Sequence, residues 1–170
     1  MNTSRRILLL TLLALAPALR ANEETDPGRA PIGAVAVIVY HATDGDPKAA
    51  GARAVAVDEA TAKRFRREKR LQFRHYRRLG ADTQPLLRSY ESWAEPFKPS
   101  HELLVRFEAQ GRSTADSASL DLELWLSGKK TIKTYSVIER DRPLLVLGPE
   151  WRGGRLMIEV AMATQPGKDP

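Results

Sequence analysis

The sequence contains no cysteine among its 170 residues, and this absence excludes several kinds of chemistry. The chain forms no disulfide, holds no metal through thiolates and offers no thiol nucleophile. It also lacks the lipobox cysteine that carries a bacterial lipoprotein anchor. A chain of this length buries an adequate core in a single domain without such covalent links.

Long hydrophobic runs are also missing. The longest run, ILLLTLLALA at residues 7–16, follows Arg5 and Arg6 and precedes small residues at 16–21. It is too short to span about 30 Å of hydrocarbon as a helix. A positive start, a short apolar run and a small-residue cleavage point predict a cleaved signal peptide over residues 1–21. The expected location is the periplasm or the outside, with no transmembrane segment left after signal removal.

Polar segments at both ends of the remaining chain mark the predicted boundaries of its domain. Residues 22–30 are predicted to be a flexible N-terminal segment, and residues 165–170 a disordered tail. Residues 31–164 are then expected to form a single β-rich domain.

Recognisable catalytic and metal-binding motifs are absent as well. His101-Glu102 begins like a zinc-protease motif, but Val105 stands where a second histidine is required. Asp44-Gly45-Asp46 lacks the later ligands of a calcium loop, and no G-x-S-x-G motif occurs. The sequence therefore predicts no cofactor, no metal and no catalytic residues. The alternative of an enzyme acting on an envelope polymer depends on His41, which lies close to Asp44 and Asp46 in the sequence.

The strongest positive signal is a leucine hairpin at residues 117–138. Leu120, Leu122, Leu124 and Leu126 alternate with polar residues, so in a strand they share one face. A break at residues 127–129 and a second β-rich run predict a hairpin. Asp121 and Glu123, on the opposite face, are expected to be solvated. A hairpin needs further strands to cover its apolar face.

Other segments supply such strands. Strands are predicted at residues 32–40, 71–79, 102–107, 144–147 and 156–162, a helix at 58–70 capped by Asp58, and mostly loop at 80–100. Trp93 and Phe97 are expected to fold back onto the core, and Trp151 to cap its end. The fold class predicted is mainly β (α+β), an antiparallel β-sandwich or partly closed barrel with one basic helix.

One segment carries an unusual charge. Residues 63–78 hold nine basic residues and one acidic residue, Glu68, a net +8. If cleavage follows Ala21, the mature chain keeps a net +3, so its other residues carry a net −5. The predicted binding residues are Lys63, Arg64, Arg66, Arg67, Lys69, Arg70, Arg74, Arg77 and Arg78.

This segment suggests a function. Arginine binds carboxylates and phosphates bidentately, and an exported protein meets envelope components rather than nucleic acid. We therefore expect a non-enzymatic domain that binds an envelope protein or an anionic envelope polymer. The alternatives are the enzyme above, a structural subunit of an envelope assembly that pairs through a sheet edge, and a basic run that is only a solvated face.

A loose resemblance supports export. The order of Tyr76-Arg77-Arg78-Leu79-Gly80, the leucine hairpin, Arg142-Pro143-Leu144-Leu145 and the glycine-containing turn at 148–154 is similar to small secreted β-rich bacterial proteins of unknown function. The resemblance implies a secreted β-rich fold and no particular chemistry.

Overall fold

The computed structural model describes residues 26–163, except 112 and 115. The predicted signal peptide and the C-terminal tail lie outside these residues. Of the segment predicted to be flexible, residues 26–30 are described. They contain a short 3-10 helix, η1 (Pro27–Arg29), whose Asp26 side chain accepts a hydrogen bond from Tyr90.

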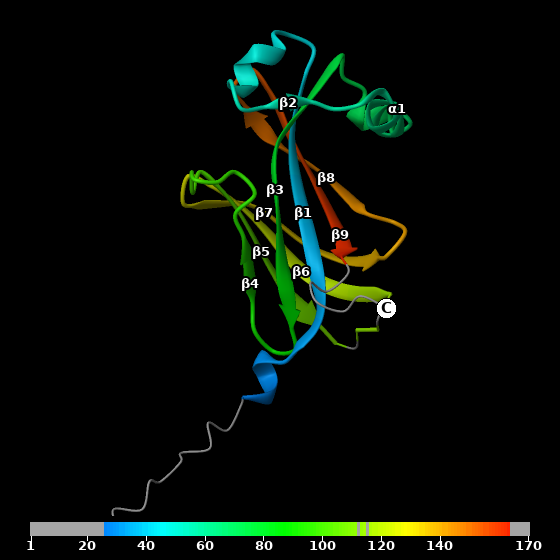
Figure 1. The fold of residues 1–170 in the computed structure, drawn as a ribbon, viewed down its shortest axis with the longest axis vertical. Helices are drawn as coiled ribbons and strands as arrows, with labels where there is room; N and C mark the ends of the chain where they lie inside the picture. The colour runs from blue at the N-terminus through cyan, green and yellow to red at the C-terminus, as the bar shows by residue number, and fades with distance from the viewer. Residues whose placement is uncertain (1–25, 112, 115, 164–170) are drawn as a thin grey trace, which may run out of the picture.

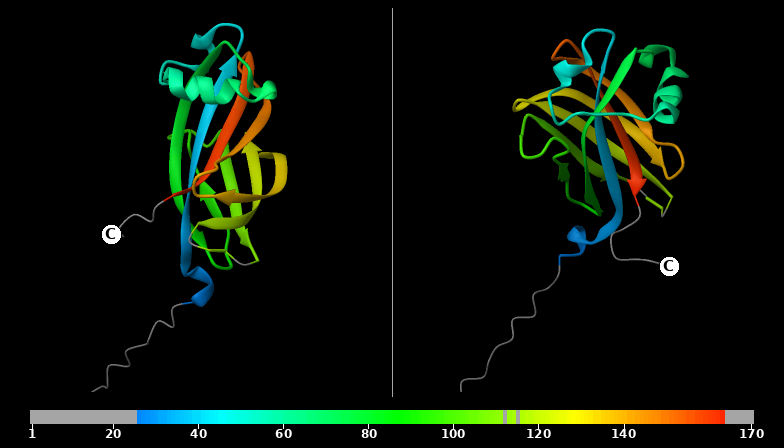
Figure 2. Two further views of the ribbon diagram at one scale, coloured as in Figure 1. Left: turned by 90° about the vertical axis from the view of Figure 1, so that its right-hand side faces the viewer. Right: turned by 45° about the horizontal axis from the view of Figure 1, so that its top comes forward.

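Two antiparallel sheets pack face to face, which confirms the predicted β-sandwich (Figures 1 and 2). Sheet A has the strand order β2-β3-β1-β9-β8, and sheet B has the order β4-β5-β6-β7. The strands are β1 (Pro31–Thr43), β2 (Val55–Ala56), β3 (His75–Leu87), β4 (Ser92–Ala94), β5 (Leu103–Gln110), β6 (Ser117–Leu126), β7 (Lys129–Glu139), β8 (Leu144–Trp151) and β9 (Gly154–Ala163).

The predicted leucine face lies in the core between the sheets. Leu120, Leu122 and Leu124 are buried, and Leu126 packs against the same cluster. They face apolar side chains of β5 and sheet A, including Leu103, Val105, Phe107, Val35, Val37, Val39, Leu156, Ile158 and Val160. Between β6 and β7, Ser127 (φ 50°) and Gly128 (φ 75°) both adopt the left-handed conformation. Two such residues form the tight turn whose twist suits a hairpin.

A second, smaller core lies on the outer face of sheet A. Helix α1 (Glu59–Arg66) lays Ala62 and Phe65 on this face, against Tyr40 and Tyr76. The side chain of Asp58 accepts from the backbone N–H of Thr61 (2.8 Å), so the predicted cap is confirmed. The helix ends earlier than the predicted residue 70, and a separate 3-10 turn, η3 (Lys69–Leu71), follows. Another 3-10 helix, η2 (Pro47–Ala50), joins β1 to β2.

The prediction for residues 71–100 was wrong in its boundaries. Leu71 and Phe73 precede the strand, while β3 continues through residues 80–87, within the segment expected to be mostly loop. Gly80, Asp82 and Pro85 are poor strand formers, but β3 pairs along its length with β1. Proline is tolerated there because β2 pairs only with residues 77–78, so the rest of β3 lies at an edge of sheet A.

Two other expectations needed correction. Phe97 is buried as predicted, but Trp93 is 36% exposed and packs on Trp125 at the outer face of sheet B. Asp121 and Glu123 lie on that outer face as predicted, yet they are buried rather than solvated. The basic side chains that cover them and form ion pairs with them, at nitrogen–oxygen distances between 2.9 and 3.9 Å, are Arg106, Lys130 and Lys133.

Candidate functional site

The basic segment forms a cap on the outer face of sheet A, near the upper end of that sheet in Figure 1. It runs through α1 and η3 into the start of β3. Phe65 holds the cap in place, since its ring lies 5.0 Å from that of Tyr40 and 5.3 Å from that of Tyr76. The nine predicted binding residues share this region but have different surroundings.

Arg64 is a structural residue. Its guanidinium donates to Glu159 Oε2 at 2.8 Å, and the hydroxyl of Tyr40 donates to the same oxygen at 3.0 Å. Glu159 is only 8% exposed. Burial and the neighbouring carboxylate raise the pKa of Tyr40, so its hydroxyl stays protonated. The ion pair joins α1 to β9 and leaves Arg64 committed to an internal partner.

Arg66 and Arg77 are also held within the fold. Arg66 forms an ion pair with Glu59 (3.0 Å) and lies over the ring of Tyr76. Arg77 donates to the carbonyl of Ala54. Side chains alternate along a strand, so Arg77 lies on the opposite face of sheet A from the buried Tyr76. Both arginines therefore have partners within the chain.

Six basic side chains remain exposed, and within the described part of the chain none of them forms an ion pair with a carboxylate. We call them the basic surface: Lys63, Arg67, Lys69, Arg70, Arg74 and Arg78. Glu68, also exposed, is the acidic residue among them in the sequence. Clustered charge of one sign raises the local potential and attracts anions.

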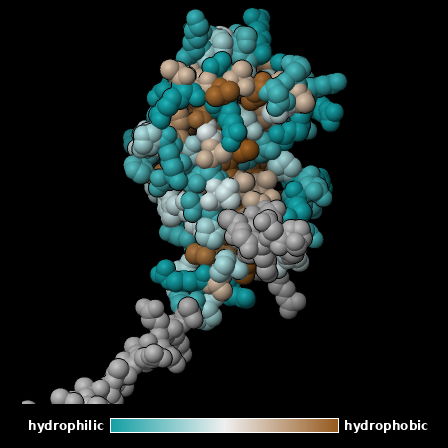
Figure 3. All heavy atoms as spheres, in the orientation of Figure 1, coloured by the Kyte–Doolittle hydropathy of each residue, from teal (hydrophilic) through white to brown (hydrophobic). Residues whose placement is uncertain are grey.

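The surface around the cap has no large apolar patch on the face shown in Figure 3. Apolar side chains there form small groups separated by hydrophilic ones. The exposed fraction of Val55, in β2, is 64%. Isolated apolar residues of this kind are normal on a protein surface.

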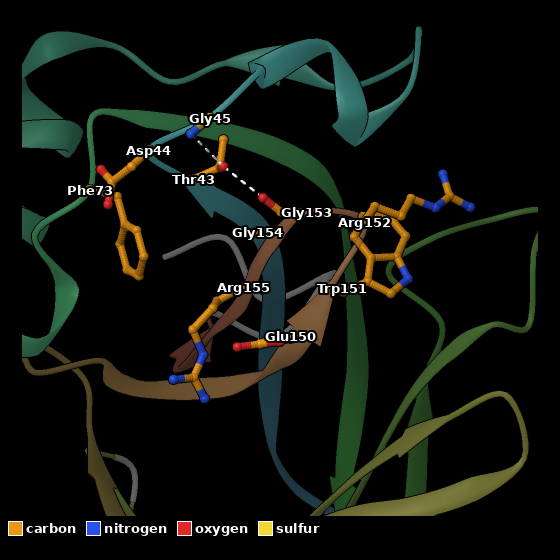
Figure 4. Close-up of a pocket in the computed structure, with 10 residues that line it drawn as sticks. All are labelled: Thr43, Asp44, Gly45, Phe73, Glu150, Trp151, Arg152, Gly153, Gly154 and Arg155. Carbon is orange, nitrogen blue, oxygen red and sulfur yellow. Dashed lines mark hydrogen bonds between the residues drawn. The ribbon is translucent and has the colours of Figure 1, made fainter.

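A cavity of about 630 Å³ lies beside the cap, where the turn after β8 meets the end of β1 (Figure 4). Asp44 and Phe73 lie together on one side of it, and Trp151 and Arg152 on the other. Several of its polar groups already have hydrogen-bond partners within the fold. Asp44 accepts from the backbone N–H of Arg74 at 2.8 Å, and Thr43 donates to the carbonyl of Gly153 at 2.9 Å.

The three residues of the enzyme alternative are not brought together in this cavity. His41 does not line it and is 0% exposed. Its Nε2 lies 3.2 Å from the carbonyl oxygen of Trp151, which can only accept, so Nε2 carries the proton of the neutral ring. Asp46 instead caps η2 by accepting from the backbone N–H of Lys48. Of the three, only Asp44 lines the cavity.

Burial lowers the pKa of His41, and the positive charge of Arg152 adds to this effect. Its Nδ1 has no hydrogen-bond partner among the described residues. Trp151, whose ring lies 5.7 Å from that of His41, is buried and caps the end of the core as predicted.

Among residues 26–163 apart from 112 and 115, no cluster of three or more histidine, aspartate or glutamate side chains is arranged to hold a metal ion. In the same part of the chain, no helix is long and apolar enough to cross a membrane.

An ionic cluster on sheet B was not anticipated from the sequence. Arg106, at 15% side-chain exposure, contacts four carboxylates: Glu91, Glu108, Asp121 and Glu123. Alternation of charged residues along β5 and β6 is visible in the sequence, but their pairing depends on the strand register, which places Arg106 opposite Glu123. With Lys130 and Lys133 the cluster holds three basic and four acidic side chains, so most of its charge is compensated internally, and we interpret it as structural.

Comparison with known proteins does not extend this description: no protein-family model, curated protein or solved structure matches the chain.

Proposed function

We propose that the protein is a non-enzymatic, exported β-sandwich domain that binds an acidic envelope protein or an anionic envelope polymer through its basic surface. One observation carries the proposal. Six of the nine predicted binding residues are exposed and form no ion pair within the described residues, whereas Arg64, Arg66 and Arg77 have internal partners. A cation with no internal partner is available to an external anion.

Export is supported by the sequence, through the short apolar run and the preceding arginines at the N-terminus. The mature protein is expected to begin near Leu19 or Asn22. Mass spectrometry of the native protein measures this directly, and an intact Met1 in the membrane fraction would contradict cleavage.

The binding test compares two sets of substitutions. Replacing Arg67, Arg70 and Arg74 with glutamine should weaken binding to poly-L-glutamate and to phosphatidylglycerol vesicles by about tenfold at low salt. Binding of the parent protein should weaken as salt rises, since exposed charges interact over only about 8 Å at physiological ionic strength. Folding should be unchanged, because surface substitutions move stability by about 0.5 kcal/mol or less.

Arg64→Gln serves as the matched control. It removes one positive charge from the same basic segment but breaks the contact with Glu159. We expect Arg64→Gln to reduce mainly the free energy of unfolding and to reduce the binding affinity less. Equal binding by the parent and the triple variant at low salt would show that the basic surface is only solvated.

A further inference from the structure

Strand β8 forms the outer edge of sheet A. It pairs with β9 on one side, and no strand of the described chain pairs with its other side. Its first half, Leu144–Leu147, carries no charge, and all four side chains are half-buried. The edge of sheet B on the same flank, β7, instead carries Lys129, Lys130 and Lys133. Lysines on an edge strand oppose the addition of another strand, and β8 lacks this protection in its first half.

A groove of about 620 Å³ runs between β8 and η3. Its apolar lining includes Leu71 from η3 and Leu145 and Leu147 from β8. Its lining also includes the exposed side chains of Lys69 and Arg70, together with Glu68. The groove therefore combines an apolar floor with a rim of net positive charge, and its two basic residues belong to the basic surface.

The register of β8 explains how the groove meets the strand edge. Leu145 lies opposite Glu159 and Leu147 opposite Met157, on the outer face that α1 and η3 cover. Leu144 and Val146 pack instead toward the core between the sheets. A strand laid along β8 would place every second side chain against Leu145 and Leu147, beneath η3.

We propose that the β8 edge and this groove bind an extended segment of a partner protein, which adds to sheet A as a further strand. Alternate apolar side chains of the segment occupy the groove, and its carboxylates contact Lys69 and Arg70. This mode supplies affinity through main-chain hydrogen bonds and specificity through alternate side chains. The inference rests on the proposed function and names the chemistry of its partner.

The chemistry of the site favours a peptide over a lipid. An acyl chain fills an apolar groove but leaves the unpaired N–H and C=O groups of an edge strand without partners. A second copy of β8 is also disfavoured, because Leu144–Leu147 brings no carboxylate to the basic rim. Its acidic residue, Glu150, lies beyond the irregularity between Leu147 and Glu150.

The test uses a fluorescein-labelled peptide of alternating valine and glutamate residues, followed by fluorescence anisotropy with the full chain. Three comparison peptides accompany it: alternating valine and lysine, the same valine–glutamate peptide N-methylated at every second residue, and poly-L-glutamate. N-methylation removes amide donors from one edge of the strand while keeping the charges. We expect the unmodified valine–glutamate peptide to bind at least about tenfold more tightly than the N-methylated and lysine peptides.

Paired variants separate the groove from the rest of the basic surface. Lys69→Glu with Arg70→Glu reverses the rim, and Lys63→Glu with Arg74→Glu makes the same charge change outside the groove. All four residues are exposed, so both variants should fold, and thermal melting checks this. The rim variant should lose about tenfold more affinity for the peptide than its control.

The rate of amide hydrogen exchange in β8 distinguishes strand addition from simple charge attraction, which would not change it. Bound peptide should slow exchange within residues 144–147 if a strand adds there. Equal losses in the two variants, equal binding of the N-methylated peptide, or unchanged exchange in β8 would each overturn strand addition. If poly-L-glutamate binds in those cases, the proposed function stands. If no acidic probe binds, both proposals fail.

Discussion

Gly80 in β3 lies directly against the backbone of Pro96: a Cβ atom at position 80 would stand 1.8 Å from the carbonyl oxygen of Pro96. Real Cβ atoms do not approach an oxygen so closely, and a backbone group cannot swing aside as a flexible side chain can. The segment that joins β4 to β5 therefore brings its backbone against β3 at Pro96 because position 80 has no side chain.

Gly80→Ala should consequently destabilise the protein by about 3 kcal/mol, because backbone must move to admit the methyl group. Gly45→Ala is the matched control, since its Cβ would meet Thr43 Oγ1 at an ordinary 3.5 Å. Chemical denaturation measures both. Similar midpoints for the two variants would show that residues 96–97 shift without cost.

Leu122→Asp should abolish cooperative unfolding. Leu122 is 4% exposed within the core between the sheets, so an unpaired carboxylate there costs about 4 kcal/mol or more. Tyr135→Asp on neighbouring β7 is the control, because Tyr135 is 67% exposed. Thermal melting followed by circular dichroism distinguishes them. A sharp melt for Leu122→Asp, close to that of the parent, would contradict the inward placement.

Arg106→Met should cost about 3 kcal/mol of stability. The substitution leaves the buried carboxylates of Asp121 and Glu123 with less compensation, and breaking a buried ion pair from one side is strongly destabilising. Arg142→Met removes an arginine from the exposed pair with Glu139, where the effect should be about 0.5 kcal/mol or less. Urea denaturation compares the two. Equal stabilities would mean that Lys130 and Lys133 suffice to neutralise the cluster.

His41 should make stability fall as the pH drops below its ordinary pKa of 6.5. Burial lowers the pKa of His41 in the folded protein, so the unfolded chain binds its proton first. Above that value both states are neutral and His41 has no effect. Below it the free energy of unfolding should decrease by at most about 1.4 kcal/mol per pH unit, down to the lowered pKa.

Urea denaturation between pH 7 and pH 5 measures this slope. His41→Asn should flatten it. An equal slope in His41→Asn and the parent would assign the effect to other groups. Carboxylates such as Glu123, whose pKa is lowered by its hydrogen bond with Lys130, are expected to contribute only at more acidic pH.

Local pattern was enough to predict the parts of the fold where polarity alternates. Leu120, Leu122 and Leu124 reveal their strand face because every second residue is polar, and Asp58 marks the start of α1. Residues 80–87 carry no such signal, since β3 extends there through pairing with β1 rather than through its own propensity. Pairing partners that are distant in sequence are invisible to a local pattern.

The basic surface was predictable in composition but not in detail. Charge density alone placed all nine residues in one group. The separation of Arg64 from the exposed six depends on Glu159, which lies 95 positions away in the chain. The groove beside η3 could not be predicted from the sequence either, because its two walls come from the distant residues 68–71 and 143–147.

The position of β9 in sheet A has a consequence for how the chain folds. β9 lies between β1 and β8, so residues 154–163 complete the interior of the sheet that residues 31–43 begin. Contacts between segments so far apart raise the contact order, and such topologies fold slowly. The strand pairing of sheet A cannot be completed while β9 is still being synthesised. A nascent chain without these residues keeps β1 unpaired on one side, with the backbone N–H and C=O groups of that side open to other partners.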